Sequence, residues 1–388
     1  MPTLQAVILA AGESSRFWPL NQKHKSLIKI MGRPLIWYTI NGLKKSGVKD
    51  IIVVQGPKRD VQSELKKYKF KNLKINYIVQ PKPKSTGDAV WQARKLIKGP
   101  FIVVGGHKID IKEYLPLLLK KFVQNRNEVI LLGVKTDRPQ DFGMIRFERK
   151  KILEIIENPQ KGKEPSKIKV AESYIFPADF FNYYKMVPRK EDNLIDAINL
   201  LIKEKGAEFV LSEKEPVSLK YPWDVFSAQE YLFKNSGTKL YMGKNCKISK
   251  NCYLRGFVSI GDNCKIGNSV EIKNSIIGDN TRIPHLSYIG DSIIGENCNL
   301  GAGTITANLR FDKKNVKVKV KGDLVDTGRE KLGCVMGGNT QTGINVSLMP
   351  GVLIGSNCLV GPGSVVLENL KDNTVFYTKS PRTIKWRL

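Results

Sequence analysis

Aliphatic residues recur every six positions in the C-terminal third of the chain. The first unbroken run consists of Ile248, Leu254, Ile260, Ile266 and Ile272. An α-helix would need a period of about 3.6 residues, and a half-buried strand would need a period of about 2. A period of six instead predicts a solenoid of short strands, in which each hexapeptide turns one aliphatic side chain inward. Three hexapeptides make one triangular coil, so residues eighteen apart are expected to stack.

The six cysteines follow the same repeat. All six lie beyond residue 240; they are Cys246, Cys252, Cys264, Cys298, Cys334 and Cys358. Each of them except Cys334 directly follows an asparagine. No two have the CxxC spacing of a zinc site, so a buried structural thiol is the favoured interpretation. Stacking at eighteen residues places Cys246 under Cys264.

Strand-like and helix-like runs alternate over the first 230 residues. The strand-like runs are Gln5–Leu9, Ile51–Val54, Ile75–Val79, Phe101–Val104 and Val129–Val134. The helix-like runs are Pro34–Ser46, Asp60–Tyr68, Asp88–Ile97 and Asp110–Phe122. This alternation predicts a doubly wound, Rossmann-like α/β sheet. We expect the α/β domain at 1–230, a connector at 231–239 and the β-helix domain at 240–388, with a hairpin insertion at about 310–331 and a basic C-terminal tail.

The charge balance is strongly basic. The 388 residues include 64 Lys and Arg against 36 Asp and Glu, a formal net charge of +28. Such a charge raises nucleic acid as a partner, but the lysines are scattered and form no RGG tract. A solvated basic surface is favoured, followed by attraction for phosphorylated small molecules. No apolar run reaches the roughly 18–20 residues of a membrane span, and the N-terminus lacks a basic signal-peptide region. We expect a cytoplasmic protein without a membrane partner.

A small-residue turn follows the first strand. In VILAAGESSRFWPL, Leu9 ends the apolar run, and Ala10, Ala11 and Gly12 let the main chain approach a ligand. Successive N–H groups in such a turn can cradle phosphate. The basic residues that follow, Arg16 and Lys25, can pair with the charge of a nucleotide.

With the run KSLIKIMGRPLI, the segment Leu9–Ile36 resembles the signature of the sugar-1-phosphate nucleotidyltransferases. That family joins an NTP to a sugar 1-phosphate, releases pyrophosphate and requires Mg²⁺. The resemblance implies nucleotide binding by the turn and by the base-recognition residues, which are Leu9, Ala10, Ala11, Gly12, Arg16, Lys25, Gln80, Gly87 and Asp88. It implies sugar binding by Gly143 of Asp141-Phe142-Gly143 and by Glu157 of Glu157-Asn158-Pro159.

The two Mg²⁺ carboxylates of that family are missing at the matching positions. His107 follows FIVVGG where the family has aspartate, and Ser218 holds the second position in VSLKYPWDVF. Mg²⁺ prefers hard oxygen ligands, for which imidazole is a poor substitute. Asp110 and Asp224 are the candidate replacements.

The repeat over Leu240–Leu370 resembles the left-handed parallel β-helix of the hexapeptide-repeat transferases. The stretch PHLSYIGDSIIGENCNLGAGTITANLRFDKKNVKVK resembles the acetyltransferase half of the bacterial enzyme that makes UDP-N-acetylglucosamine, and more closely its archaeal bifunctional relatives. The resemblance implies a catalytic base at His285, an orienting Tyr288, amides at Asn299 and Asn308, an oxyanion N–H at Ala302, and phosphate-side lysines at Lys314 and Lys317.

Arg255 and Lys273 are eighteen residues apart, so they stack on one face, where two cations can converge on one phosphate. The resemblance implies a homotrimer with acetyl-CoA in the cleft between neighbouring β-helices. Gly343, Gly361 and Arg382 are the candidate coenzyme A contacts.

Three functions remain open at this point. The first is a bifunctional enzyme that acetylates an amino-sugar 1-phosphate and couples it to an NTP. The second is an acetyltransferase whose N-terminal domain only binds ligand, because its metal site has decayed. The third is a non-enzymatic scaffold or regulator with the same two domains. The choice between glucosamine and galactosamine 1-phosphate, and the choice of NTP, are also open.

Overall fold

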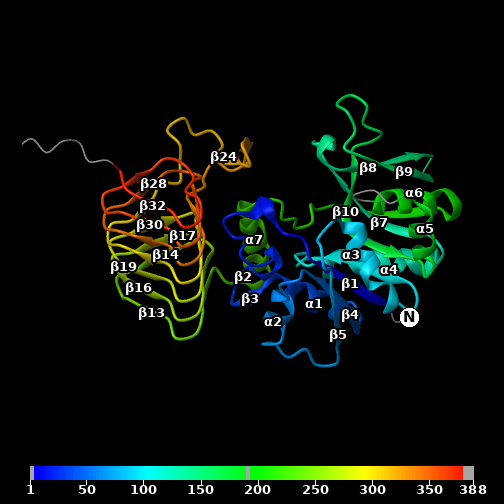
Figure 1. Cartoon of the computed structure of the whole chain (residues 1–388), viewed down its shortest axis with the longest axis horizontal. Helices are drawn as coiled ribbons and strands as arrows, with labels where there is room; N and C mark the ends of the chain where they lie inside the picture. Colours follow the sequence, from blue (N-terminus) through cyan, green and yellow to red (C-terminus); the bar gives the residue numbers. More distant parts are fainter. Residues whose placement is uncertain (1–3, 150, 189–192, 379–388) are drawn as a thin grey trace, which may run out of the picture. The chain divides into compact units, whose positions relative to one another are not determined.

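The computed structural model describes residues 4–149, 151–188 and 193–378. It divides into two compact units, each described separately below (Figure 1). The first unit holds Met1–Glu13 and Leu35–Ser218, and the second holds Ser14–Pro34 and Leu219–Leu388. The segment Ser14–Pro34 therefore packs with the β-helix, although it lies near the N-terminus of the chain.

The first unit is built on a nine-stranded sheet with the order β11-β7-β10-β6-β1-β4-β5, and β8 and β9 form a hairpin beside β10. The strands are β1 (Gln5–Ala10), β4 (Asp50–Gln55), β5 (Lys74–Val79), β6 (Phe101–Gly105), β7 (Val129–Lys135), β8 (Gly143–Glu148), β9 (Lys151–Glu157), β10 (Ile168–Phe176) and β11 (Ala207–Ser212). Strand β1 lies parallel between β4 and β6, whereas β10 is antiparallel to β6 and β7. The central strands read as continuous apolar runs because helices cover them.

Six helices pack on this sheet. They are α1 (Leu35–Lys45), α2 (Asp60–Leu65), α3 (Thr86–Gln92), α4 (Ile111–Gln124), α5 (Phe180–Met186) and α6 (Leu194–Lys205). Helix α1 packs on α4, whereas α3 and α5 pack on α6. Side chains alternate along β1, so Val7 joins the α3–α6 core while its neighbours Ala6 and Ile8 are buried toward the other face. The doubly wound sheet and the strands and helices expected from the sequence are confirmed.

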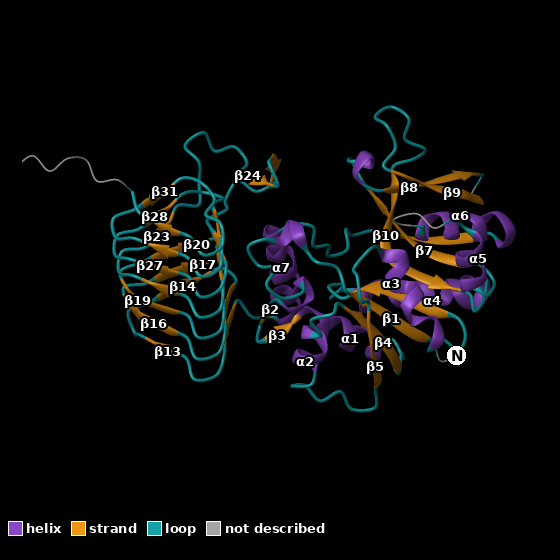
Figure 2. Cartoon of the chain, in the orientation of Figure 1, coloured by secondary structure: helices purple, strands orange, loops and turns teal. Residues whose placement is uncertain are grey.

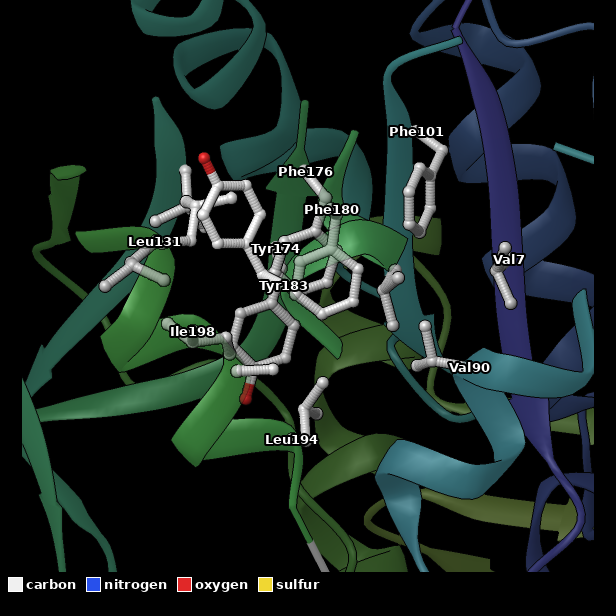
Figure 3. Close-up of a cluster of buried hydrophobic side chains, with 14 of the residues drawn as sticks. Val7, Val90, Phe101, Leu131, Tyr174, Phe176, Phe180, Tyr183, Leu194 and Ile198 are labelled. Carbon is white, nitrogen blue, oxygen red and sulfur yellow. The ribbon is translucent and has the colours of Figure 1, made fainter. Parts of the chain in front are cut away.

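Aromatic rings dominate the core between the sheet and the α3–α6 layer (Figure 3). Phe101 of β6 and Phe176 of β10 lie beside Phe180 of α5, and the Phe176 and Phe180 rings stack with their centroids 4.0 Å apart. Such ring pairs add about 0.5–1.5 kcal/mol to the stabilisation from burial alone. This packing fixes β10, which lines the cavity described below, and α5, which packs on α6.

The second unit is a triangular parallel β-helix whose coils stack one above another (Figure 2). One face, named here the β12 face, contains β12 (Leu240–Met242), β15 (Val258–Ile260), β18 (Ile276–Ile277), β21 (Ile293–Ile294), β26 (Val335–Met336) and β29 (Leu353–Ile354). The β13 face contains β13 (Lys247–Ile248), β16 (Lys265–Asn268), β19 (Arg282–His285), β22 (Asn299–Leu300), β27 (Gln341–Thr342), β30 (Leu359–Val360) and β32 (Val375–Phe376). The β14 face contains β14 (Tyr253–Arg255), β17 (Glu271–Lys273), β20 (Tyr288–Gly290), β23 (Ile305–Thr306), β28 (Ser347–Leu348) and β31 (Val365–Val366).

A column of asparagines runs along the corner between the β12 and β13 faces, named here the asparagine corner. These residues have φ between 55° and 61°, and the side-chain amide of each of the first six donates to Oδ1 of the next; they are Asn245, Asn263, Asn280, Asn297, Asn339, Asn357 and Asn373. Asparagine tolerates this left-handed conformation better than most residues. The cysteines that follow four of these asparagines point inward, as Cys264 does toward the Gly278 oxygen at 3.1 Å. The Asn-Cys pattern is therefore a corner followed by a core position.

An insertion interrupts the coils between β23 and β26, where the ladder spacing rises to 42 residues. Within it, β24 (Lys317–Val320) and β25 (Asp323–Asp326) form an antiparallel hairpin. Lys321 and Gly322 make its two-residue turn, both with positive φ, the geometry that favours glycine in such turns. The hairpin lies inside the predicted 310–331 segment.

Helix α7 (Val225–Ser236) precedes the first coil. It ends at Gly237, which has the left-handed φ of 72° common after helices. The Gln229 amide donates to the Phe257 and Ser275 carbonyl oxygens at 2.9 and 3.2 Å, which attaches the helix to two successive coils. Two short strands, β2 (Lys29–Ile30) and β3 (Arg33–Pro34), pair within the N-terminal segment of this unit. No helix among the described residues is both long and apolar enough to cross a membrane.

We predict that thiol reagents will react with Cys246 and Cys264, the stacked pair, at different rates. Cys264 is buried, and burial raises the pKa of its thiol to about 12. The thiolate is the reactive form, so at pH 8 about one molecule in ten thousand would carry it. Cys246 points inward as the repeat predicted, with Sγ 3.0 Å from the Gly261 oxygen, but it belongs to the terminal coil and is only half-buried. Iodoacetamide labelling followed by peptide mass spectrometry should modify Cys246 at least about 100-fold faster, and equal rates would contradict the register.

Candidate active sites

The outer side of the β14 face carries the two stacked basic residues that the sequence predicted. Arg255 pairs in register with Lys273, and Lys273 pairs with Gly290 on the next coil. The Tyr288 ring lies over Gly290, where an added Cβ would be 2.4 Å from the tyrosine oxygen. Two cations and one tyrosine therefore share this face on three successive coils.

Carboxylates hold both cations. Arg255 donates through Nε and Nη2 to Glu271 Oε1 at 2.7 and 2.6 Å, and its side chain is 42% exposed. Lys273 Nζ lies 3.1 Å from Asp291 Oδ2, and its side chain is 15% exposed. The fixed lysine and the open arginine present positive charge on one surface, which suits a phosphate.

Asp291 is the centre of a polar cluster at the corner between the β14 and β12 faces, named here the Asp291 corner. Its side chain is only 4% exposed. Oδ1 accepts from the Asn274 amide at 3.2 Å, and Oδ2 accepts from Asn308 at 2.5 Å and from Lys273 at 3.1 Å. The same Asn308 amide donates to Tyr288 Oη at 3.2 Å. Because a buried carboxylate is stable only when paired, this cluster fixes three predicted site residues together.

Burial, more than any other factor, raises the pKa of Tyr288. The Asp291 charge raises it further, whereas the hydrogen bond from Asn308 lowers it. The phenol is therefore protonated at neutral pH. Its oxygen accepts from Asn308, and its O–H can donate to a bound molecule.

His285 ends β19, at the corner between the β13 and β14 faces, named here the His285 corner. Asn268 is its partner on the preceding coil. Arg282 is in register with Asn299 on the next coil. His285 follows Arg282 by three residues and Ala302 follows Asn299 by three, so Ala302 takes the place of His285 on that next coil. The His285 side chain is exposed, and its ring has no hydrogen-bond partner among the residues that the structure describes. An imidazole and a main-chain N–H predicted to act together thus occupy one corner.

Gly343 and Gly361 follow strands of the β13 face at the same corner, and coil stacking explains both glycines. An added Cβ would lie 2.5 Å from the Pro362 nitrogen at Gly343, and 2.0 Å from the Tyr377 ring at Gly361. Their contact with coenzyme A stays a prediction. Arg382, the third candidate contact, lies outside the described residues.

Three other predicted residues lie apart from the Asp291 cluster. Asn299 is exposed on the β13 face, in register with Arg282. Lys314 and Lys317 are exposed in the insertion, and Lys317 pairs with Asp326 across the hairpin. Within residues 4–149, 151–188 and 193–378, no side-chain bond joins these three to Asp291 or to its partners.

In the first unit, the predicted phosphate turn leaves the carboxyl end of β1. Gly106 donates its N–H to the Leu9 oxygen at 2.9 Å, and Ala10 and Ala11 are buried. An added Cβ at Gly12 would meet nothing within 4 Å. The turn therefore presents main chain to open space, as a phosphate-binding turn requires.

The predicted base-recognition residues come together at the start of α3. Gln80 is buried, and its amide donates to Asp88 Oδ2 at 2.6 Å and to the Ser85 oxygen at 3.3 Å. Ser85 caps the helix by accepting from the Asp88 N–H at 3.2 Å, and Gly87 is buried beside it. These bonds hold Gln80, Gly87 and Asp88 in one arrangement.

A cavity of about 640 Å³ lies between β9, β10, α3 and α6. Glu157, Glu172, Asp196 and Thr86 line it. The Glu157 carboxylate lies directly over Gly143, where an added Cβ would be 2.5 Å from Oε1. Glu157, which lies against Gly143, is thus at the wall of a cavity of mixed polar and apolar lining that is large enough for a small ligand.

Arg16 and Lys25 belong to the second unit, unlike the other predicted nucleotide-binding residues. Arg16 is exposed in a short helical turn, η1 (Ser15–Phe17). Lys25 begins η2 (Lys25–Leu27), and its Nζ donates to the Leu219 oxygen at 2.6 Å.

The donors near His107 do not match a Mg²⁺ site. His107 is buried, with Nε2 3.9 Å from Glu172 Oε2. Asp110 is also buried, and its Oδ2 accepts from the Val217 N–H at 2.7 Å. Burial raises the pKa of Asp110, and its Oδ1 has no hydrogen-bond partner in the described chain. One imidazole and one distant carboxylate are a poor donor set for a hard cation.

The remaining metal candidates do not complete that set. Ser218 is exposed and offers only a hydroxyl. Asp224 Oδ2 accepts from the Lys220 and Tyr221 N–H groups at 2.7 Å each, because it caps the short helix Pro222–Asp224. In the part of the chain that the structure describes, no group of three or more His, Cys, Asp or Glu side chains could hold a metal ion.

Two site residues were missed from the sequence. Asp291 follows a Gly, like many surface aspartates, but it lies seventeen residues from both Asn274 and Asn308, a spacing that could have revealed the column. Glu172 approaches His107 from β10 through strand pairing between distant segments. The local sequence carries no signal for that approach.

Comparison with known families also finds two parts, although the first match includes residues 14–34, which the structure groups with the second unit. The nucleotidyl transferase family matches residues 5–224, the GMPPB C-terminal domain matches residues 237–342, and six bacterial transferase hexapeptide repeats match residues 333–368. These matches confirm a Rossmann-like nucleotidyltransferase fold followed by a left-handed β-helix. Two solved structures share the first fold: apo UDP-glucose pyrophosphorylase (TM-score 0.54, 19% identity, 60% of this chain and 99% of that one) and a putative glucose-1-phosphate thymidylyltransferase from Bacillus anthracis (0.53, 23%, 59% and 94%).

Two curated relatives are similar over nearly their whole length. A protein from Sulfurisphaera tokodaii, named bifunctional sugar-1-phosphate nucleotidylyltransferase/acetyltransferase, is 35% identical and covers 94% of this chain and 97% of its own. A protein from Methanocaldococcus jannaschii, named bifunctional protein GlmU, is 33% identical, with 97% and 98% covered. Both domains and their order agree, so the chain belongs to the family of bifunctional sugar-1-phosphate nucleotidyltransferase/acetyltransferases.

Proposed function

We propose that the β-helix transfers an acetyl group from acetyl-CoA to the amine of an amino-sugar 1-phosphate, and that the first unit couples the product to an NTP. The observation that carries the acetyltransferase assignment is the buried Asp291 carboxylate, which binds Lys273 and Asn308 and, through Asn308, orients Tyr288 on the β14 face, whose other edge is the His285 corner. Similarity to proteins named as two-function enzymes supports the coupled reactions, and it gives no support to a scaffold or to a purely binding N-terminal domain.

In the acetyl transfer, the substrate nitrogen attacks the thioester carbonyl carbon. A C–N bond forms, the C–S bond breaks and coenzyme A leaves as its thiol. His285 is the proposed base that takes the proton from nitrogen, and its exposure leaves the ring open to substrate. The Ala302 N–H is the proposed donor to the developing oxyanion, since both groups occupy the same corner.

Residues of the β14 face are proposed to orient the substrate. Arg255 and Lys273 are proposed to hold the sugar phosphate, with Lys273 fixed by Asp291 before substrate arrives. The protonated Tyr288 hydroxyl is proposed to donate to the sugar, and its bond from Asn308 sets its direction. Such advance ordering reduces the entropy lost on binding.

In the nucleotidyl transfer, a phosphate oxygen of the sugar attacks the α-phosphorus of the NTP, and pyrophosphate leaves. The turn at Gly12 is proposed to receive the phosphates, and Gln80 the base. Glu157 is proposed to accept from sugar hydroxyls in the cavity of about 640 Å³. Catalysis of this kind depends chiefly on positioning and charge stabilisation.

The family resemblance implies Mg²⁺ for this second reaction. The side chains at His107 and Ser218 do not fit such a site, for the reasons given above, so we assign no step to a metal. A cytoplasmic location agrees with the use of acetyl-CoA and NTP, and it stays a prediction.

We also propose that the chain forms a homotrimer in which acetyl-CoA lies between neighbouring β-helices. Exposed apolar side chains near the His285 corner and in the insertion support this, namely Leu286, Ile344 and Phe311. Covering them would remove apolar surface from water. Analytical ultracentrifugation should give the mass of three chains at micromolar concentration, and a stable monomer would contradict the proposal.

Replacing the proposed base tests the acetyltransferase assignment. His285→Ala should lower coenzyme A release by about 10²–10⁴-fold, the usual effect of losing a general base. Lys265→Ala, an exposed change on the same face one coil away, is the matched control and should leave the rate unchanged. Free thiol is measured with amino-sugar 1-phosphate and acetyl-CoA. Unchanged turnover by a folded His285→Ala protein would remove His285 from the mechanism.

Restoring the family carboxylates tests the first site. The double variant His107→Asp, Ser218→Asp should release pyrophosphate at least about tenfold faster with Mg²⁺, because it supplies hard oxygen donors. Mg²⁺ should also raise the melting temperature of the double variant more than that of the wild type. Coenzyme A release from the same protein is the control and should not change. A double variant no faster than wild type, with no added Mg²⁺ stabilisation, would show that these positions are not where a metal acts.

A further inference from the structure

The insertion between β23 and β26 begins and ends at the Asp291 corner. At its start, the Asn308 main-chain oxygen accepts from the Leu332 N–H at 2.9 Å. At its end, the Gly333 N–H donates to the Asp291 main-chain oxygen at 2.8 Å. Both ends of the insertion are therefore fixed at the corner that carries the buried Asp291 carboxylate.

Arg329 lies three residues before this attachment. Its main chain is held in place, because its N–H donates to Thr327 Oγ1 at 3.2 Å and its oxygen accepts from the Val316 N–H at 2.8 Å. Three residues span at most about 11 Å even when the chain is fully extended. Arg329 therefore lies close to the Asp291 corner, within the same compact unit.

Helix α7 holds the Arg329 side chain from another direction. The guanidinium carbon lies 4.7 Å from the centroid of the Phe226 ring, a cation–π distance. Gln229 of the same helix donates to the Ser275 oxygen at 3.2 Å, and Ser275 follows Lys273 by two residues. The helix that contacts Arg329 is thus itself attached beside the basic residues of the β14 face.

The Arg329 guanidinium has no acceptor in the folded chain. Its Nε is buried without a hydrogen-bond partner, and the side chain forms no ion pair with any residue that the structure describes. Burial lowers the pKa of Arg329, and the charges of Asp291, Glu230 and Asp224 raise it. The group still carries its charge at neutral pH. A charge removed from water without an acceptor is unfavourable, so the guanidinium is expected to bind an anion.

The carboxylates whose charges act on Arg329 already have other partners. Asp291 accepts three side-chain hydrogen bonds. Glu230 pairs with Lys234 at 2.6 Å, and Asp224 caps the short helix before α7. The acceptor for Arg329 is therefore expected to be a ligand rather than one of these side chains.

The position of the arginine indicates which anion this is. Arg255 ends β14 and Lys273 ends β17, so both basic residues lie at the edge of the β14 face that meets the Asp291 corner. The phosphate proposed to bind them lies at the same edge. A guanidinium presents a planar pair of N–H donors, which matches two oxygens of a phosphate.

We infer that Arg329 binds the phosphate of the amino-sugar 1-phosphate together with Arg255 and Lys273. The inference rests on the proposed acetyl transfer and adds a phosphate contact from the insertion. The β14 face would hold the phosphate from one side and the base of the insertion from another. Loss of Arg329 should therefore weaken binding of the phosphorylated sugar and leave binding of acetyl-CoA unchanged.

The test uses the full-length protein and the variant Arg329→Gln, which removes the charge. Glucosamine 1-phosphate and galactosamine 1-phosphate are assayed separately by coenzyme A release. The KM of the better substrate should rise roughly 10- to 100-fold, the loss expected for a charge-assisted hydrogen bond. The KM of acetyl-CoA, and kcat/KM for the phosphate-free amino sugar, should equal those of the wild type. The Kd of inorganic phosphate, measured by calorimetry, should rise by a similar factor.

The melting temperature distinguishes phosphate binding from a structural role. Without phosphate, Arg329→Gln should melt no lower than the wild type, because it removes a half-buried charge that has no acceptor. Inorganic phosphate should raise the melting temperature of the wild type more than that of the variant. Arg329→Lys keeps the charge but loses the planar donor pair, so its KM should rise less, by about 3- to 10-fold.

Lys319→Gln is the matched control. Lys319 is exposed on β24 of the same insertion, and the change removes the same charge from that insertion. It should alter neither the KM of the sugar phosphate, nor the Kd of inorganic phosphate, nor the melting temperature.

The outcomes separate this inference from the proposed function. If the wild type transfers no acetyl group to either sugar phosphate, the proposed function fails, and the Kd of inorganic phosphate alone then decides whether Arg329 binds phosphate. If the wild type is active and Arg329→Gln keeps its KM for the sugar phosphate, the inference is overturned. A rise confined to the KM of acetyl-CoA would overturn it by assigning Arg329 to the phosphates of coenzyme A. Equal losses with phosphorylated and phosphate-free sugars, with a lower melting temperature, would overturn it by showing a structural role.

Discussion

Main-chain hydrogen bonds between successive coils fix the β-helix, and they form only if every coil turns its corner in the same way. At the asparagine corner this turn needs a left-handed backbone, which is unfavourable for most side chains by about 1–2 kcal/mol per residue. Asparagine reduces that penalty, and its amide bonds to the next asparagine in the column. Coil register depends on this repeated corner, and the alignment of every site residue in the unit depends on coil register.

The same stacking aligns the residues proposed for catalysis and substrate binding. Arg255 lies next to Lys273, and His285 shares a column with Ala302, only because the chain advances by a nearly constant number of residues per coil. The site therefore needs no special loop to gather its residues from positions far apart in sequence. Glycines such as Gly343 remain where the next coil comes too close for any side chain.

Periodicity made much of this predictable. A period of six predicts a coil of eighteen residues. Arg255 and Lys273 are eighteen residues apart, so the coil length alone predicts that they stack. The attachment of Lys29 to Asp279 could not be predicted, because it joins residues 250 positions apart through tertiary packing alone. Cys246 is more exposed than its repeat position implies because its coil is terminal. The residue type at position 107 indicated a departure from the family's metal site, but only the fold shows that the Glu172 carboxylate lies 3.9 Å from His107.

Acidic residues replace amides in these columns where a cation must be held. In the column of Asn274, Asp291 and Asn308, an amide at the central position would turn its own N–H toward other donors. Only a carboxylate can accept from both neighbouring amides and from Lys273 at once. Asp279 follows the same rule with Asp262 N–H and Lys29. A repeat that is structural at most positions thus holds a cation at Asp291 and at Asp279, where one carboxylate accepts both from a neighbouring coil and from a lysine.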